Sequence, residues 1–186
     1  MQYYNLIHLG FSGYREVMEN CLANARILSL SLEATGWYTC VSEIHRPTPP
    51  NPSHPPSASH PPSPAHETSA SYAAGLPVVA FRLTAQFRRE YPHIKQETIS
   101  LLLRARQWII PNYALPPGED ATEILRVVVR VNMSFDLLDR LVTDVVQVTE
   151  RLMERDEVDL GVLHGGRAGL GVRREGKGEG IHRSVC

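Results

Sequence analysis

A proline-rich run splits this sequence into two segments, and any fold must accommodate it. Nine of the 14 prolines fall between residues 47 and 64, interleaved with serine and without hydrophobic periodicity. Proline removes backbone donors, and a stretch this polar buries too little apolar surface to offset the entropy of ordering it. We therefore expect residues 46–74 to form a disordered insertion between two folded segments, 1–45 and 75–156.

Before the insertion, the sequence predicts a long helix and then a strand. Apolar residues recur at three- and four-residue steps between residues 11 and 32, which is typical of an amphipathic helix. Gly36 is placed to end that helix. Residues 37–44 are rich in β-branched and aromatic side chains, which favour a strand.

After the insertion, strands and helices alternate. A helix is predicted at residues 94–106, and Ser134 can cap a second helix that follows it. Pro111 places one of the strands at a sheet edge or terminus. The predicted strands cover residues 76–83, 108–111 and 124–131.

The connections between these elements are short, which favours an antiparallel sheet with helices on one side. The predicted fold class is therefore α+β, with a long N-terminal helix. Residues 157–186 are rich in glycine and mixed charge, so we expect a mobile tail there.

Composition excludes several classes of partner. The 19 basic and 20 acidic residues are well mixed, so no field favours nucleic acid or a membrane surface. No basic segment followed by a long apolar stretch marks a secretory signal or a membrane span. Cys21, Cys40 and Cys186 are widely spaced, which fits reduced thiols and a cytoplasmic location better than disulfides.

Two features of the insertion suggest binding sites, and we interpret both as passive. Histidines could ligate a metal, but their spacing is uneven and no cysteine or carboxylate cluster joins them, so we predict no metal site. PxxP matches at 49–52 and 61–64 would suit an SH3-type domain, yet such matches arise by chance in any proline-rich stretch. The histidines are His45, His54, His60 and His66.

A series of short motifs carries the main indication of function. They are QYY at 2–4, LGFSGYR at 9–15, MENC at 18–21, GLPVVAF at 75–81, WIIPNYALP at 108–116 and ILRVVVR at 124–130. In this order they closely resemble consecutive segments of glutamate decarboxylases, with a fungal-like character, over about residues 1–45 and 75–155. Such a series is far more specific than any single short pattern.

The resemblance implies the small C-terminal domain of an aminotransferase-like fold. The family uses pyridoxal 5'-phosphate to convert L-glutamate to gamma-aminobutyrate and carbon dioxide. In the family, a lysine of a Ser-x-x-His-Lys motif in the large domain holds the cofactor as a Schiff base. The resemblance also implies a homo-oligomer, or association with a full-length subunit.

This chain departs from the family where the cofactor is concerned. Its only lysines are Lys95 and Lys177, and neither follows a histidine. No glycine-rich phosphate cradle replaces the missing motif. We therefore expect no catalytic and no cofactor-binding residue in this chain, and no decarboxylation by the chain alone.

One family function does map onto this sequence. Arg126 matches a small-domain arginine that binds a substrate carboxylate, a role that suits the permanently charged, forked guanidinium. From the strand pattern alone, Arg126 would be a solvent-facing residue that shares a face with Val128 and Arg130. With the resemblance we favour the site for Arg126 and a structural role for Arg130.

The motif at 108–116 leaves two alternatives open. Trp108, Pro111, Tyr113 and Pro116 either wall an active-site entrance or pack as a rigid loop against the sheet. Gln107 stands where the family has glycine, so a turn that needs a positive φ there would be strained.

Three functional hypotheses follow. The chain is the small-domain part of a glutamate decarboxylase, inactive alone, or it is a non-catalytic fragment that docks on an intact decarboxylase subunit. The third hypothesis is a product without a cellular function. Exposed apolar surface would favour association in the first two cases.

Overall fold

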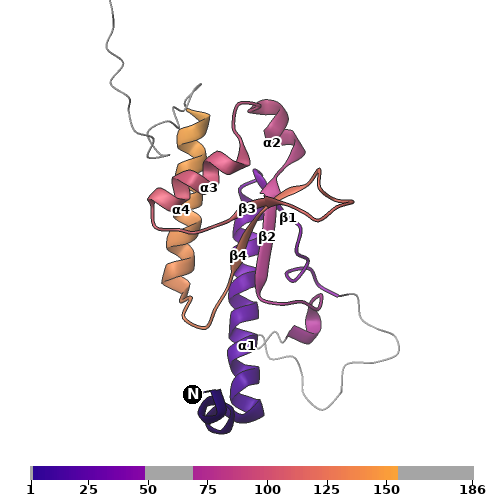
Figure 1. Ribbon diagram of the computed structural model, residues 1–186, viewed down its shortest axis with the longest axis vertical. Helices are drawn as coiled ribbons and strands as arrows, with labels where there is room; N and C mark the ends of the chain where they lie inside the picture. Colours follow the sequence, from indigo (N-terminus) through magenta and orange to yellow (C-terminus); the bar gives the residue numbers. More distant parts are fainter. Residues whose placement is uncertain (1, 49–68, 155–186) are drawn as a thin grey trace, which may run out of the picture.

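The computed structural model describes residues 2–48 and 69–154 (Figure 1). The rest of the predicted insertion and the predicted tail lie outside the described residues. In chain order the elements are α1 (Gln2–Ala34), β1 (Tyr38–Cys40), the 3-10 helix η1 (Ser69–Ser71), β2 (Val78–Leu83), α2 (Ala85–Glu90), α3 (Gln96–Ala105), β3 (Asn112–Ala114), β4 (Glu123–Val128) and α4 (Phe135–Met153).

The four strands form one antiparallel sheet in the order β1-β2-β4-β3. Tyr38 pairs with Leu83 and Val79 pairs with Val127, so strands from both sides of the predicted insertion share the sheet. Alternate side chains on β2 and β4 are buried, as expected for a sheet with one covered face. The predicted α+β class with an antiparallel sheet is confirmed.

Three helices cover the buried face of the sheet. α1 contacts β1 and β2, α3 contacts β3 and β4, and α4 contacts both α1 and α3. The hydroxyls of Tyr38 and Thr149 lie 2.7 Å apart, which links β1 to α4 across the core. On the opposite face Arg126 and Val128 are exposed, so the helices lie on one side, as predicted.

The long N-terminal helix is present and begins earlier than predicted. It runs from Gln2 with a kink at Gly10, where φ is 57° and ψ is −169°. Figure 1 shows the first turns bending away from the remainder of α1. Gly36 lies just past the end with φ 73° and donates its N–H to Glu33 O at 3.0 Å, which confirms its role as the terminating glycine.

Ser134 caps α4, as predicted. Its hydroxyl accepts a hydrogen bond from Leu137 N at 3.3 Å. Leu141, Val145 and Val148 then form part of a buried stripe along the helix. None of the helices in the described ranges is long and apolar enough to cross a membrane.

Local predictions failed in three places. The strand predicted at 37–44 covers only Tyr38–Cys40, because Val41 N and Ser42 N both donate to Ala80 O and the ladder ends there. The short helix α2 was not predicted, although Thr84 caps it by accepting from Phe87 N at 3.1 Å.

The third failure concerns residues 108–111, where a strand was expected. The strand is instead Asn112–Ala114, and it is an edge strand. Pro111 has no N–H to donate, and its carbonyl alone accepts from Arg126 N at 3.2 Å. Ladder pairing therefore begins only at the following residue.

Candidate functional site

Arg126 lies in the middle of β4 on the open face of the sheet. Its neighbours Leu125 and Val127 point into the core, so strand alternation directs Arg126 outward. Val128 and Arg130 are exposed as well, which agrees with the predicted common face. β2 on one side and β3 on the other hold this position in the sheet.

A cleft of about 270 Å³ opens beside Arg126. Among the described residues, the charged ones that line it are Arg126 and Arg130, and none is a carboxylate. The cleft therefore suits an anion that also carries an apolar portion. The lining residues are Trp108, Ile109, Ile110, Pro111, Arg126, Val127, Val128, Arg130, Met133 and Leu141.

Tyr113 on the edge strand β3 helps to position Arg126. The Arg126 guanidinium carbon lies 5.3 Å from the centroid of the Tyr113 ring, within range of a cation–π interaction. Within the described ranges, neither Arg126 nor Arg130 forms an ion pair. One face of the Arg126 guanidinium thus rests on the Tyr113 ring. In the described residues no carboxylate pairs with its N–H groups, which leaves them available to an anionic ligand.

Asp144 on α4 fixes the wall of the cleft that Trp108 forms. The Trp108 Nε1–H donates to Asp144 Oδ2 at 2.7 Å, and Arg106 donates to Asp144 Oδ1. The guanidinium carbon of Arg140 lies 5.9 Å from the centroid of the Trp108 ring. Burial alone would raise the pKa of Asp144, but the hydrogen bonds from Trp108 and Arg106, together with the positive charges of Arg106 and Arg140, outweigh it and lower the pKa.

Gln107 adopts the left-handed conformation that was expected to be strained. Its φ is 73°, and it is the one non-glycine residue with positive φ in the described part of the chain. Gln107 N donates to Arg104 O and Trp108 N donates to Leu103 O, both at 3.0 Å. These two hydrogen bonds end α3 and turn Trp108 toward α4.

These contacts bear on both interpretations of the 108–116 motif. Trp108 and Pro111 line the cleft, and Tyr113 contacts Arg126, as the entrance-wall interpretation requires. Trp108 also packs against the core and bonds to Asp144, as the rigid-loop interpretation requires. The contacts of Trp108 fit both interpretations, so the two alternatives stay open for this motif.

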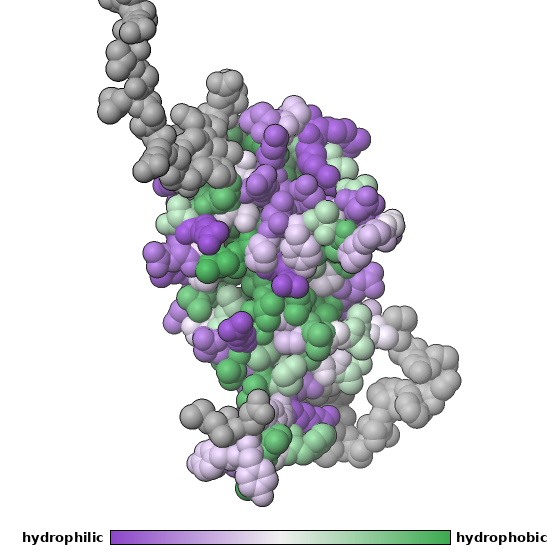
Figure 2. Space-filling model, in the orientation of Figure 1, coloured by the Kyte–Doolittle hydropathy of each residue, from purple (hydrophilic) through white to green (hydrophobic). Residues whose placement is uncertain are grey.

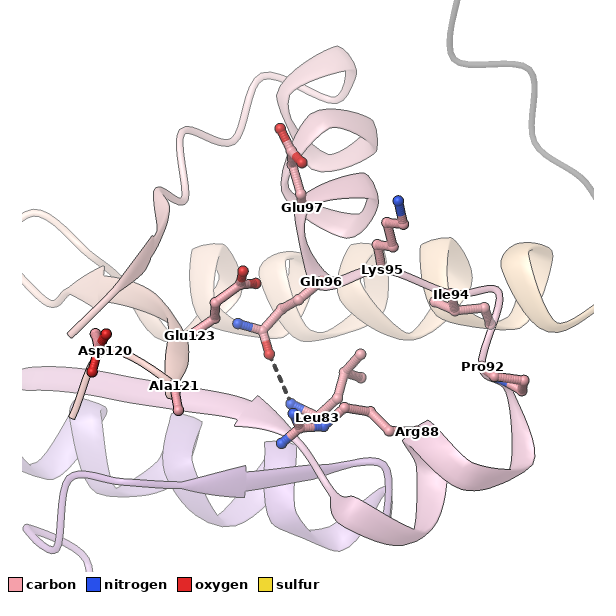
Figure 3. Close-up of a pocket in the computed structure, with 10 residues that line it drawn as sticks. All are labelled: Leu83, Arg88, Pro92, Ile94, Lys95, Gln96, Glu97, Asp120, Ala121 and Glu123. Carbon is pink, nitrogen blue, oxygen red and sulfur yellow. Dashed lines mark hydrogen bonds between the residues drawn. The ribbon is translucent and has the colours of Figure 1, made fainter. Parts of the chain in front are cut away.

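A second, larger cavity of about 430 Å³ lies between α2, the start of α3 and the turn before β4 (Figure 3). Gln96 is buried at its edge, where its carbonyl accepts from Leu83 N at 3.0 Å and its amide donates to Asn112 Oδ1 at 2.8 Å. This glutamine ties α3 to both β2 and β3. The cavity and the Arg126 cleft share no lining residue.

Lys95 lines this second cavity, and its surroundings do not fit a phosphate-bearing cofactor. It is an exposed residue at the N-cap of α3, and in Figure 3 its ammonium group points away from Leu83 and Arg88. Three carboxylates, those of Glu97, Asp120 and Glu123, line the same cavity and outnumber the two cations, Arg88 and Lys95, so the net charge of the lining disfavours a phosphate. Lys177 lies outside the described residues.

Of the four histidines considered as metal ligands, His45 alone lies in the described residues. His45 is buried, and its Nε2 lies 3.1 Å from Glu33 Oε2. Across residues 2–48 and 69–154 no group of three or more histidine, cysteine or acidic side chains is arranged to hold a metal ion. His54, His60 and His66 lie outside the described residues.

Large apolar side chains reach the surface at several places in the described residues, including Leu30, Leu76 and two groups. Tyr3, Tyr4, Ile7 and Phe11 are between 66% and 83% exposed around the kink in α1. The second group is Ile109, which lines the Arg126 cleft, with Val131 and Phe135, which lie between β4 and the start of α4 and are similarly exposed. Figure 2 shows hydrophobic residues reaching the surface across the middle of the molecule in this view.

The fold and the cleft define a class of protein: an α+β domain that presents an arginine at the open face of an antiparallel sheet, beside an apolar wall. No protein-family model matches the chain. It is 40% identical to the glutamate decarboxylase of Saccharomyces cerevisiae over 163 residues, which cover 84% of this chain and 27% of the yeast protein. It is 33% identical to the enzyme of Solanum lycopersicum over 151 residues, covering 81% of this chain and 23% of that protein.

A solved structure agrees with these matches. The glutamate decarboxylase of Lactobacillus brevis superposes with a TM-score of 0.62 at 26% identity, over 84% of this chain and 28% of that chain. The chain is therefore a relative of the glutamate decarboxylases over most of its length, as the sequence motifs indicated. It spans about a quarter of the length of the curated relatives it matches.

Proposed function

We propose that this chain supplies the small domain of a glutamate decarboxylase and binds a carboxylate of L-glutamate through Arg126. The observation that supports this most directly is the cleft, in whose described lining Arg126 and Arg130 are the only charged residues and the other residues are apolar. A guanidinium pairs with both oxygens of a carboxylate, and apolar walls strengthen that pairing by excluding water. The domain would consist of residues 1–45 and 75–156.

We propose that the pyridoxal phosphate needed for the reaction is held by residues of the enzyme other than those of this sequence. When bound to an enzyme, the cofactor withdraws electrons from the substrate as carbon dioxide leaves. This chain contributes Arg126, which binds the substrate carboxylate, and the apolar wall of the cleft beside it. The carboxylates around Lys95 support this division of roles, since they disfavour phosphate binding there. The buried free thiols of Cys21 and Cys40 support a reducing compartment, the cytoplasm.

Complementation tests this proposal. A decarboxylase relative truncated to lack the segment that this chain matches is co-expressed with the full 186-residue chain. We expect glutamate-dependent carbon dioxide release from the pair and none from either polypeptide alone. Arg126→Gln should abolish the gain, whereas Arg104→Gln, at an exposed position on α3, should leave it intact. Equal gain with Arg126→Gln would refute the role of Arg126.

Cofactor capture gives an independent check. The purified chain is mixed with pyridoxal phosphate and glutamate and treated with borohydride, which reduces any Schiff base to a stable amine. We expect no stoichiometric adduct at Lys95 or Lys177 and no carbon dioxide above a free-cofactor control. A single adduct together with turnover would show that the chain holds the cofactor itself.

The second candidate function is docking on an intact decarboxylase subunit without catalysis. The exposed tyrosines, Ile7 and Phe11 around the kink of α1 favour it, because apolar surface of this kind is usually covered by a partner. Co-purification with an intact subunit distinguishes the two functions. Binding without any gain in activity, lost on Phe11→Asp, would support docking alone.

A further inference from the structure

The two described segments that flank residues 49–68 are joined to each other. We call these segments, residues 41–48 and 69–75, the strap. Pro47 and Tyr72 form an antiparallel bridge. Thr48 N donates to Ser71 O at 3.0 Å, and Ala73 N donates to Arg46 O at 2.9 Å. The chain therefore leaves and re-enters the described fold at the same place.

Helix α1 carries a stripe of charged residues that faces the strap. Glu19, Arg26 and Glu33 recur every seven residues, which is nearly two helical turns, so they lie on one side of the helix. Successive members are about 10 Å apart along the helix axis. We call these three residues the polar stripe.

The first two members of the polar stripe bind both halves of the strap. Glu19 accepts from Ser69 N at 2.9 Å and from the Ser69 hydroxyl at 2.5 Å. Arg26 Nε donates to Ile44 O at 3.3 Å, and its guanidinium carbon lies 4.2 Å from the centroid of the Tyr72 ring. Arg26 thus bridges the segment before residue 49 and the segment after residue 68.

Glu33, the third member, binds the start of the strap. Its carboxylate accepts from Cys40 N at 3.0 Å and from Arg46 at 3.2 Å, and it lies 3.1 Å from His45 Nε2. His45 is 4% exposed, and Ile44 beside it is also 4% exposed. This end of the strap is therefore packed into the fold rather than laid over it.

Burial separates the polar stripe from an ordinary solvated helix face. Arg26 is only 6% exposed, and Glu19 and Glu33 are partly buried. Buried charges are stable only when they are paired and hydrogen-bonded, and here the strap supplies the partners. The hydrogen bonds from Ser69 also lower the pKa of Glu19.

We propose that the polar stripe is a clamp that fixes both ends of the strap on α1, so that the sheet and the Arg126 cleft do not depend on residues 49–68. The clamp holds together the two ends of the chain that flank residues 49–68. Changes within residues 49–68 should then leave the sheet and the Arg126 cleft unaltered. This inference is independent of the proposed catalytic role, because it concerns α1 and the strap alone.

Excision tests the clamp. In the full chain, residues 49–68 are replaced by two glycines, and thermal unfolding is compared with the parent. We expect an equal or higher Tm, because a shorter loop costs less closure entropy. A fall of more than about 3 °C would overturn the proposal. If the short link prevents folding, a Gly-Ser segment of the original length replaces residues 49–68, and its failure to fold would also overturn it.

Hydrogen exchange tests the stripe directly. Arg26→Met keeps an apolar stem and removes the guanidinium. We expect the Ser69 and Ala73 amides to exchange at least tenfold faster, while the Val127 amide on β4 stays protected. Arg104→Met, at an exposed site without an ion pair in the described residues, is the matched control and should change neither set. Unchanged exchange at Ser69 in Arg26→Met, or equal loss of protection at Val127, would refute the clamp.

Discussion

Replacing Asp144 by asparagine should loosen the wall of the Arg126 cleft and lower stability by a measurable amount. The Asp144 side chain is 14% exposed and accepts hydrogen bonds from Trp108 and Arg106. Hydrogen bonds to a charged group contribute about 1.5–3 kcal/mol each, and asparagine keeps one acceptor oxygen. We therefore expect Asp144→Asn to reduce the free energy of unfolding by about 2 kcal/mol at pH 7.

The effect should depend on pH in a defined direction. The pKa of Asp144 is lowered in the folded chain, so its contribution is fully present above the unfolded value of about 3.9 and is lost as pH falls through the lower folded value. Urea unfolding at pH 7, pH 5 and pH 3 measures this. The free energies of unfolding of the parent and of Asp144→Asn should converge only at the acidic end of this range.

Tryptophan fluorescence, to which Trp37 and Trp108 both contribute, offers a second readout, and Asp139→Asn is the matched control. Asp139 is an exposed aspartate on the same helix, so its replacement should change stability little. A red shift of the tryptophan emission is expected for Asp144→Asn alone, since Trp108 loses its fixed partner. If the two variants unfold at the same urea concentration at pH 7, the argument for Asp144 is wrong.

Three further predictions concern local geometry and reactivity. Gln107→Gly should raise the free energy of unfolding by up to about 1 kcal/mol, because glycine adopts a positive φ without strain. Gln107→Ala should bring no such gain, and urea titration of both variants checks this. Gly75→Ala should destabilise the chain by about 1 kcal/mol or more, because the added Cβ would lie 2.5 Å from Cγ2 of Ile44, which is buried and has little room to move. A lower Tm is the expected observation. Burial raises the pKa of Cys40 to about 11. Its thiol should therefore resist iodoacetamide at pH 8 in the folded chain and react in urea, which mass spectrometry can follow. Rapid labelling without urea would contradict its buried position.

Local periodicity predicted those parts of the fold that depend on neighbouring residues. The apolar spacing in α1, the terminating Gly36 and the Ser134 cap are all properties of a few consecutive residues. Strand alternation likewise placed Arg126 on the open face. Each of these features is encoded within one or two turns of helix or one strand.

The features that the sequence did not predict depend on distant partners. Trp108 and Asp144 are 36 residues apart, and Glu19 and Ser69 are 50 residues apart. In the sequence, Glu19 and Glu33 look like ordinary solvent-facing residues of an amphipathic helix. Their regular seven-residue spacing with Arg26 was the one available signal of a common partner.

The edges of the sheet limit how this molecule can meet another protein. Both outer strands, β1 and β3, are three residues long, and prolines stand close to either end of β3. Short edges interrupted by proline offer few free backbone groups for an incoming strand, which protects against cross-molecular β-pairing and fibre growth. A complex formed through the described sheet would therefore depend on side-chain contacts, which single-residue substitutions can test.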